Sequence, residues 1–251
     1  MQHLEFTAAG IGGIDLYAQA WLPRVAPRAV IVVSHGLAEH GGRYETLAGE
    51  LVQRGYAVYA VDHRGHGRSS GPRANIERFA HVVADFCAFT ERCAGEHPAT
   101  PVFMLGHSMG GAVAFASALR LQHMLHGLIL SAPALATDQS VPRLQELFVR
   151  LLSVVAPGTG ALTLPADAVS RDPSVVARYA ADPLVHHKAI PARTLVELLG
   201  AMQGFPASAP GLHLPTLVLH GTADQLVPLA ATRRVYQAFG TRDCVVKLYD
   251  G

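Results

Sequence analysis

The chain has 251 residues, of which half are apolar and 16% are charged, and its formal net charge is +1. This length suits one large α/β domain with room for an insertion, and the apolar content excludes an intrinsically disordered chain. The near-neutral charge gives no electrostatic argument for binding nucleic acid or an anionic membrane.

Metal sites, disulfides and targeting segments would leave recognisable sequence patterns. The three cysteines fit neither a disulfide framework nor a zinc site, and the fourteen histidines include no HExxH or Cys/His spacing. Residues Met1–Gly10 lack the basic and apolar regions of a secretory signal, and no apolar run is as long as a membrane span. We therefore expect a cytoplasmic protein without a metal site.

Short apolar runs alternate with helical patterns in the first 133 residues and again after residue 214. The predicted strands are Leu16–Leu22, Ala29–Ser34, Ala57–Asp62, Val102–Gly106, Gly127–Ser131, Thr216–His220 and Val245–Tyr249. The predicted helices are Tyr44–Arg54, Ile76–Glu96, Ala112–Leu121 and Ala230–Phe239. This alternation indicates a parallel sheet covered on both faces, and we expect the first strand to lie antiparallel at its edge.

A His-Gly turn follows the strand that ends at Ser34. Such a turn can aim the backbone N–H of Leu37 at the carbonyl oxygen of a bound acyl group. Because a backbone amide carries this role, we expect the His35 side chain to be a buried turn residue and not a catalytic group. The loop after the next strand, residues 62–69, is expected to be scaffold held by hydrogen bonds from its aspartate and arginines.

The strand Val102–Gly106 runs into the motif Gly-x-Ser-x-Gly, with Ser108 at its centre and a helical pattern after it. A serine hydroxyl is a poor nucleophile until geometry and a base activate it. A sharp strand-to-helix turn supplies that geometry, and the glycines on either side give the backbone room to form it. We expect Ser108 to be a nucleophile and the N–H of Met109 to be the second oxyanion donor; the alternative is an ordinary glycine-rich turn.

The regular alternation stops after residue 133 and resumes at Pro215. The first of three helical patterns in between carries apolar residues at helical spacing: Leu144, Leu147, Phe148, Leu151, Leu152 and Val155. The other two patterns are Pro173–Ala180 and Ala192–Gly204. A helical insertion above the C-terminal edge of the sheet is typical of a cap over a ligand site. The apolar stripe can either line an acyl pocket or pack the cap onto the body.

Asp224 lies in the loop after the strand Thr216–His220. A carboxylate there would orient the histidine that activates the serine; the alternative is an aspartate that caps the helix beginning near Leu229. The expected order is serine, acid, histidine, yet the last histidine of the chain is His220. We therefore expect the base to be missing from residues 1–251 and the chain, as it stands, to be nearly inactive.

Three other histidine positions are unconvincing as the base. His107 adjoins the serine, but neighbouring side chains point in different directions. His220 ends a strand, where its ring more readily packs. The pair His186-His187 lies in the insertion and would bind a metal only with further ligands, which the sequence does not supply.

Together these motifs resemble the monoacylglycerol lipases of the α/β-hydrolase superfamily. The resemblance rests on residues 35–44, 62–71, 106–111 and 220–224 and, in the insertion, on residues 170–173 and 179–185. It implies an α/β-hydrolase core formed by residues 1–133 and 215–251, a helical cap formed by residues 134–214, and hydrolysis of fatty-acyl esters of glycerol without a cofactor. In this family the histidine follows a strand ending in Tyr-Asp/Glu-Gly, so the chain resembles a lipase that ends just before its base.

The resemblance also implies residue roles. Ser108 would be the nucleophile and Asp224 the acid. Glu39, Arg43 and Tyr179 would form the polar end of the pocket that receives glycerol. The alternative for Glu39 and Arg43 is a structural ion pair one helical turn apart.

Two other functions remain open. One is a lysophospholipase or carboxylesterase on the same fold, since fold alone does not determine the substrate. The other is a non-catalytic lipid-binding protein, favoured only by the missing histidine. In each case the expected partner is a small lipid ester, with transient contact between the cap and a membrane surface and no nucleic acid or obligate protein partner.

Overall fold

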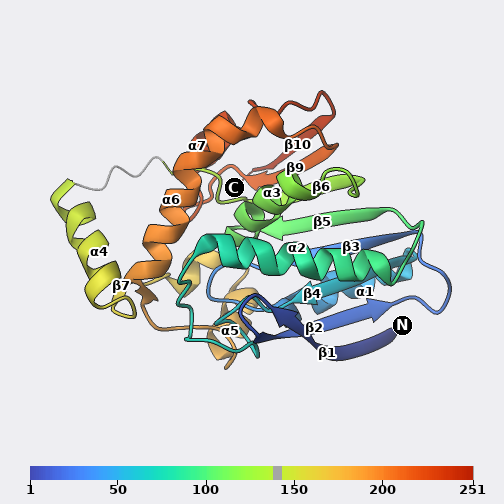
Figure 1. Ribbon diagram of the computed structural model, residues 1–251, viewed down its shortest axis with the longest axis horizontal. Coiled ribbons are helices and arrows are strands. Elements are labelled where there is room, and N and C mark those ends of the chain that lie inside the picture. The colour runs from blue at the N-terminus through green and yellow to red at the C-terminus, as the bar shows by residue number, and fades with distance from the viewer. Residues whose placement is uncertain (138–142, 251) are drawn as a thin grey trace.

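The computed structural model describes residues 1–137 and 143–250, except for the side chains of residues 143–147. The centre of this part of the chain is an eight-stranded sheet with the order β1-β2-β4-β3-β5-β6-β9-β10 (Figure 1). The strands are β1 (Gln2–Gly10), β2 (Ile14–Leu22), β3 (Ala29–Ser34), β4 (Tyr56–Val61), β5 (Val102–His107), β6 (Gly127–Ser131), β9 (Thr216–Gly221) and β10 (Cys244–Tyr249). All neighbours from β4 to β10 are parallel, so this is the expected α/β-hydrolase sheet.

One expectation about the sheet is wrong. The strand predicted at Leu16–Leu22 is antiparallel to β4 as expected, but it does not form the edge, because β1 pairs along its other side. Only Ala8 of β1 is buried, so this strand has no apolar alternation by which a sequence could reveal it. It forms because the turn after Gly10 folds it back along β2.

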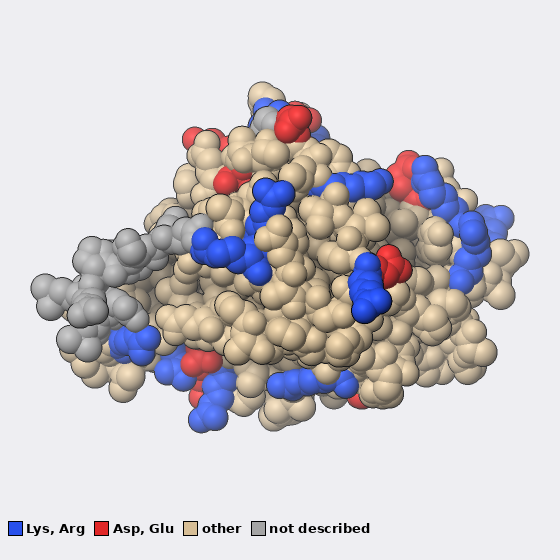
Figure 2. Space-filling model, turned by 90° about the horizontal axis from the view of Figure 1, so that it is seen from above, with Lys and Arg blue, Asp and Glu red and all other residues tan. Residues whose placement is uncertain are grey.

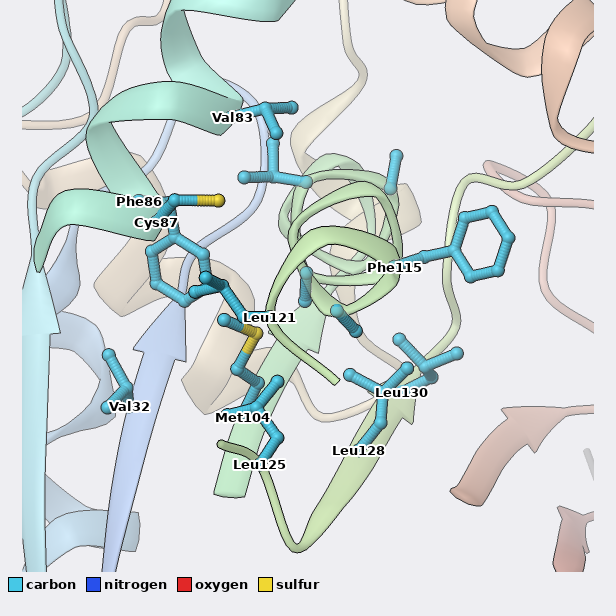
Figure 3. Close-up of a cluster of buried hydrophobic side chains, with 14 of the residues drawn as sticks. Val32, Val83, Phe86, Cys87, Met104, Phe115, Leu121, Leu125, Leu128 and Leu130 are labelled. Carbon is cyan, nitrogen blue, oxygen red and sulfur yellow. The ribbon is translucent and has the colours of Figure 1, made fainter. Parts of the chain in front are cut away.

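Helices cover both faces of the sheet. They are α1 (Glu45–Gln53), preceded by the 3₁₀ turn η1 (Gly41–Tyr44), and α2 (Phe79–Gly95), α3 (Met109–Leu121) and α7 (Leu229–Tyr236). The larger core lies under α2, α3 and α7, whereas α1 packs on the other face over Trp21. Figure 3 shows the larger core, where Phe86 of α2 and Phe115 of α3 lie over Met104 and Leu130 of the central strands, all fully buried.

The chain between β6 and β9 forms the insertion, residues 134–214. Its described elements are α4 (Arg143–Val155), β7 (Gly160–Leu162), η2 (Ala166–Val169), α5 (Pro173–Ala181), β8 (Ile190–Pro191), α6 (Ala192–Ser208) and η3 (Ala209–Gly211). The short ribbon of β7 and β8 was not expected from the sequence. α6 lies against α2 and α3, and α4 packs on α6 at the far end of the molecule (Figure 1).

The apolar stripe of α4 is described only in part, and in that part Leu152 is half-buried while the other apolar members are exposed. The side chains of Leu144 and Leu147 lie outside the described residues. Phe148, Leu151 and Val155 are 59%, 57% and 67% exposed, so they do not pack the insertion onto the body.

Each helix in residues 1–137 and 143–250 is too short or too polar to cross a lipid bilayer. On the face shown in Figure 2, charged side chains are dispersed among uncharged ones.

Candidate active site

Ser108 is the single residue between the end of β5 and the start of α3, as the motif predicts. Its backbone angles, φ +53° and ψ −121°, are rarely adopted by residues with a side chain. The flanking glycines make this turn possible: a Cβ on Gly110 would overlap the carbonyl oxygens of Ser34 and His35, and one on Gly106 would overlap the backbone of Gly110. Strain of this kind costs about 1–3 kcal/mol and is typical of functional sites.

Two backbone N–H groups lie beside this serine. Met109 is the first residue of α3, so its N–H has no partner within the helix. No hydrogen bond among the described residues uses the N–H of Leu37. The turn that carries Leu37 approaches the serine closely, because a Cβ on Gly36 would lie 3.4 Å from Ser108 Cβ. With the positive end of the α3 dipole at the same place, the site can stabilise a negatively charged oxygen.

The turn formed by residues 35–44 fixes both peptide groups of Gly36. The Gly36 N–H donates to Glu39 Oε1 at 2.6 Å, and the Gly36 carbonyl accepts from His35 Nδ1 at 2.8 Å. In a trans peptide the C=O and the next N–H point in opposite directions. Holding the Gly36 carbonyl therefore also sets the direction of the Leu37 N–H.

A cluster of three buried histidines lies at this turn: His35 of the turn itself, and His63 and His66 of the loop after β4. His63 donates its backbone N–H to His35 Nε2 at 2.9 Å, which leaves the hydrogen of His35 on Nδ1. The His35 ring centroid lies 4.4 Å from that of His63 and 5.4 Å from that of His66. Burial lowers the pKa of His35 and of His66 to about 3, and that of His63 well below its usual value. All three rings are therefore neutral near pH 7, and His35 is a buried turn residue, as the sequence predicts.

The carboxylate of Glu39 accepts from three donors: the Gly36 N–H, the Tyr44 hydroxyl at 2.9 Å and the Arg43 guanidinium. The Glu39 side chain is only 6% exposed. The Arg43 guanidinium also lies over the ring of Tyr179, 4.8 Å from its centroid. The structure thus brings Glu39, Arg43 and Tyr179 together, and Glu39 does more than form an ion pair with Arg43.

Asp224 follows β9, at the same edge of the sheet as Ser108, with β6 between their strands. Its Oδ1 accepts from the N–H groups of Leu226 and Val227 at 2.9 and 2.8 Å, and its Oδ2 lies 3.5 Å from His220 Nε2. Burial raises the pKa of Asp224, but these hydrogen bonds outweigh it, so the pKa lies below its usual value. The carboxylate closes its own loop and makes no capping bond to α7, so the capping alternative is wrong.

No hydrogen bond among the described residues joins a histidine to the Ser108 hydroxyl. The ring of His107 turns to Ser131, with Nδ1 3.1 Å from both the carbonyl and the hydroxyl oxygen of that residue. His220 Nε2 donates to the Val227 carbonyl at 2.9 Å. Within residues 1–137 and 143–250, no group of three metal-ligating side chains gathers, and His186-His187 is not part of one.

The loop after β4 is scaffold, as expected. Asp62 accepts from the N–H groups of Gly41 and Arg68, and Arg73 donates to the Gly67 and Ser69 carbonyls. Sequence reasoning assigned no role to His40 and Asp182, whose side chains meet at 2.8 Å. These two residues are 142 positions apart, so no local pattern in one sequence could have paired them.

Residues 25–251 match the model of a protein family described as serine aminopeptidase, S33. The chain is 41% identical over 247 residues to the monoacylglycerol lipase of Mycolicibacterium smegmatis, covering 98% of this chain and 88% of that protein. It is 35% identical over 240 residues to the monoglyceride lipase of Rattus norvegicus, covering 95% and 79%. It superposes on the crystal structure of Paleococcus ferrophilus monoacylglycerol lipase with a TM-score of 0.83 at 30% identity, covering 94% and 89%.

Proposed function

Because this chain, a lipase-like carboxylic ester hydrolase, belongs to the monoacylglycerol lipase family of α/β-hydrolases, we propose that it hydrolyses monoacylglycerols to glycerol and free fatty acid. The observation that carries this proposal is the strained serine at the N-terminus of α3, beside a turn whose peptide groups are held by side chains. No metal ion or other cofactor enters the mechanism.

In this mechanism Ser108 Oγ attacks the ester carbonyl carbon and a tetrahedral oxyanion forms. The N–H groups of Leu37 and Met109 donate to that oxygen, and each such donor contributes about 3 kcal/mol to the transition state. Collapse of the intermediate leaves an acyl group on the serine and releases glycerol, and water then hydrolyses the acyl-enzyme. Asp224 would orient the histidine that moves the proton in both steps.

The identity of that histidine stays a prediction. The described rings of His35, His63, His107 and His220 are engaged elsewhere, which is consistent with a base that is not among them. The test is ester hydrolysis by residues 1–251, with Ser108→Ala as the control. If these residues turn over an ester and Ser108→Ala abolishes that turnover, a base exists within residues 1–251 and this prediction is wrong.

Glycerol would bind at the cluster of Glu39, Arg43 and Tyr179. Since the Glu39 carboxylate already accepts from three donors, its part is to hold Arg43 and the 35–44 turn, while the guanidinium and the phenol face the substrate hydroxyls. The cation–π contact between Arg43 and Tyr179 links the body of the enzyme to the insertion. The insertion, residues 134–214, would then be the cap of the pocket.

The exposed face of α4 would make transient contact with a lipid surface. Phe148, Leu151 and Val155 lie on this face and are more than half exposed. Burying such side chains at a bilayer interface is favourable, and the substrate resides there. A Phe148→Ser, Leu151→Ser variant should bind less to phosphatidylcholine vesicles in a flotation assay; unchanged binding would contradict this role.

The decisive experiment is hydrolysis of 1-decanoylglycerol by the complete gene product, with Ser108→Ala as its control. Removing the nucleophile should lower kcat about a million-fold. A decanoyl lysophospholipid and a decanoyl methyl ester, offered in parallel, test the head group. Preference for either one would contradict the monoacylglycerol assignment, and turnover unaffected by Ser108→Ala would contradict the serine mechanism.

A further inference from the structure

A strap formed by residues 179–190 of the insertion lies across the 35–44 turn. Asp182 Oδ2 accepts from His40 Nε2 at 2.8 Å, and the His186 N–H donates to the Ala38 carbonyl at 2.8 Å. Ile190, which is fully buried, belongs to the same apolar cluster as Ala38. Two hydrogen bonds and one shared apolar cluster therefore join the strap to the residues that immediately follow Leu37.

His40 is fixed on both sides. Its side chain is 9% exposed, and the partner Asp182 is itself held, because Asp182 Oδ1 accepts from the Leu184 N–H at 2.9 Å. The next amide, that of Gly41, donates to Asp62 Oδ1 at 2.7 Å. An ionised carboxylate only accepts, so the hydrogen of this bond is on His40 Nε2. His40 of the turn is therefore the hydrogen-bond donor and Asp182 of the strap is the acceptor.

Ala38 shows why the turn needs such a tie. Its φ of +66° lies in the left-handed region, which residues with a side chain occupy only when their surroundings hold them there. The carbonyl of this residue accepts from the strap, and its buried side chain belongs to the same apolar cluster as Ile190 of the strap. Ala38 follows Leu37 directly, so relaxation of this strained residue would turn the Leu37 amide.

We propose that Asp182 and His40 are positioning residues for catalysis, which keep the Leu37 N–H aimed at the oxyanion by holding the strap on the 35–44 turn. This inference rests on the proposed function, since it acts through the Leu37 amide. It makes the insertion part of the catalytic machinery in addition to a cover for the pocket. Neither side chain touches the substrate in this role.

A second carboxylate offers a matched control. Glu197 of α6 also fastens the insertion to the body, where it accepts from the Phe79 N–H at the start of α2 at 2.9 Å. This contact is made to α2 and not to the 35–44 turn. If Asp182 merely attaches the insertion, Asp182→Ala and Glu197→Ala should change the same kinetic constant. If Asp182 positions the Leu37 amide, only Asp182→Ala should change kcat.

The kinetic test uses the complete gene product and p-nitrophenyl butyrate, a soluble ester that does not depend on the monoacylglycerol assignment. Asp182→Ala and His40→Ala should each lower kcat about 10- to 100-fold with KM changed less than about threefold, because a misplaced oxyanion donor affects mainly the transition state. Asp182→Asn keeps an acceptor for His40 and should restore kcat to within about threefold of the original enzyme. The double variant should be no slower than either single one, as expected for one shared interaction.

Amide hydrogen exchange of residues 1–251 gives a readout that needs no activity. Asp182→Ala should speed exchange of the Gly36 and Gly41 amides at least tenfold and leave Phe79 unchanged, while Glu197→Ala should do the reverse. A rise in KM alone, equal effects of Asp182→Ala and Glu197→Ala, or unchanged exchange at Gly36 would overturn the proposal. If Asp182→Ala does not fold, the same measurements on His40→Ala test the proposal, because this variant removes the other partner of the hydrogen bond. If the unsubstituted protein does not hydrolyse the ester, that result counts against the proposed function. The exchange data would still test whether Asp182 holds the strap on the turn.

Discussion

The two loops that flank the candidate nucleophile are built differently. In the 35–44 turn, both backbone groups of Gly36, the N–H of Gly41 and the side chains of Glu39 and His40 have partners, and most of the residues are buried. The loop 221–228 is largely exposed, and Asp224 there is held mainly by amides of its own loop. The 35–44 turn, which would carry the oxyanion donor, is therefore held by many contacts, whereas the loop of Asp224, the proposed acid, depends on local contacts.

This difference follows from the chemistry that each loop would perform. An oxyanion donor stabilises charge only if it already points at the reacting oxygen, so several contacts must hold it in place. An acid that orients a histidine acts through another side chain and tolerates a more open loop. Substitutions in the two loops should accordingly fail in different ways.

The largest effect is expected from Asp224→Asn. The amide cannot stabilise a charged imidazole, and such a change in a triad typically lowers kcat about 10⁴-fold without unfolding the protein. The measurement is kcat of the complete gene product on p-nitrophenyl butyrate. Asp243→Asn, at an exposed position just before β10 and at the opposite edge of the sheet, is the control and should keep full activity. Equal losses in the two variants would mean that Asp224 is not the acid.

The next largest effect is a loss of stability in acid, caused by the histidine cluster beside the 35–44 turn. His35, His63 and His66 have pKa values far below 6.5 in the folded protein, so below pH 6.5 the unfolded chain gains protons that the folded chain does not. Each ring then costs about 1.4 kcal/mol per pH unit, or about 4 kcal/mol for the three. The free energy of unfolding should fall steeply between pH 6.5 and 4, as measured by urea titration.

A single variant can isolate this effect. His66→Asn keeps a donor for the Arg64 carbonyl, which His66 Nδ1 contacts at 3.0 Å, but removes the titrating ring. The slope of stability against pH should decrease by about 1.4 kcal/mol per unit. His123→Asn, at an exposed position, should leave the slope unchanged. The same slope in both variants would assign the acid sensitivity to other groups.

A smaller effect is expected from Glu39→Gln. The amide can still accept from the Gly36 N–H, but it leaves the Arg43 guanidinium without its charged partner. We expect the free energy of unfolding to fall by about 1–3 kcal/mol, since the site is nearly buried. Urea unfolding at pH 7 measures this, and an unchanged midpoint would show that the negative charge of Glu39 is not needed for stability.

The smallest effect comes from Glu50→Gln on α1. This residue also pairs with an arginine four positions along, Arg54, at 2.7 Å, but both side chains are more than half exposed. Exposed pairs of this kind contribute about 0–0.5 kcal/mol. The comparison with Glu39→Gln therefore separates the general value of an i,i+4 ion pair from the value of a carboxylate that holds a turn. If Glu50→Gln lowers the free energy of unfolding by more than about 1 kcal/mol, the two ion pairs do not differ in the way proposed.

The sequence predicted those features that depend on neighbours along the chain. The parallel strands β3 to β6, β9 and β10 begin and end within one residue of their predicted limits, because continuous apolar runs and glycine-rich turns are local signals. β1 was missed because its side chains are mostly exposed and it forms only by pairing with β2. The face of α4 was misjudged because helical periodicity identifies an apolar stripe without identifying what it contacts.

The site followed the same rule. Ser108 and its turn could be predicted because strand, glycines and helix are contiguous. The contacts of Asp182 with His40 and of Glu197 with Phe79 join residues more than 100 positions apart, and no pattern in one sequence links them. The three clustered histidines come from two loops and were likewise invisible as a group.

The position of the insertion also has a consequence for biosynthesis. β6 and β9 are adjacent parallel strands, with Ser131 opposite Leu219, yet the whole insertion is translated between them. A chain emerging from the ribosome can therefore assemble β1 to β6, including the serine turn, well before β9 and Asp224 exist. Pairing over so long a separation is slow, and the acid joins last. An unfinished polypeptide that stops before β9 would thus carry the serine turn without Asp224, so hydrolysis would begin only after β9 and its loop have been synthesised.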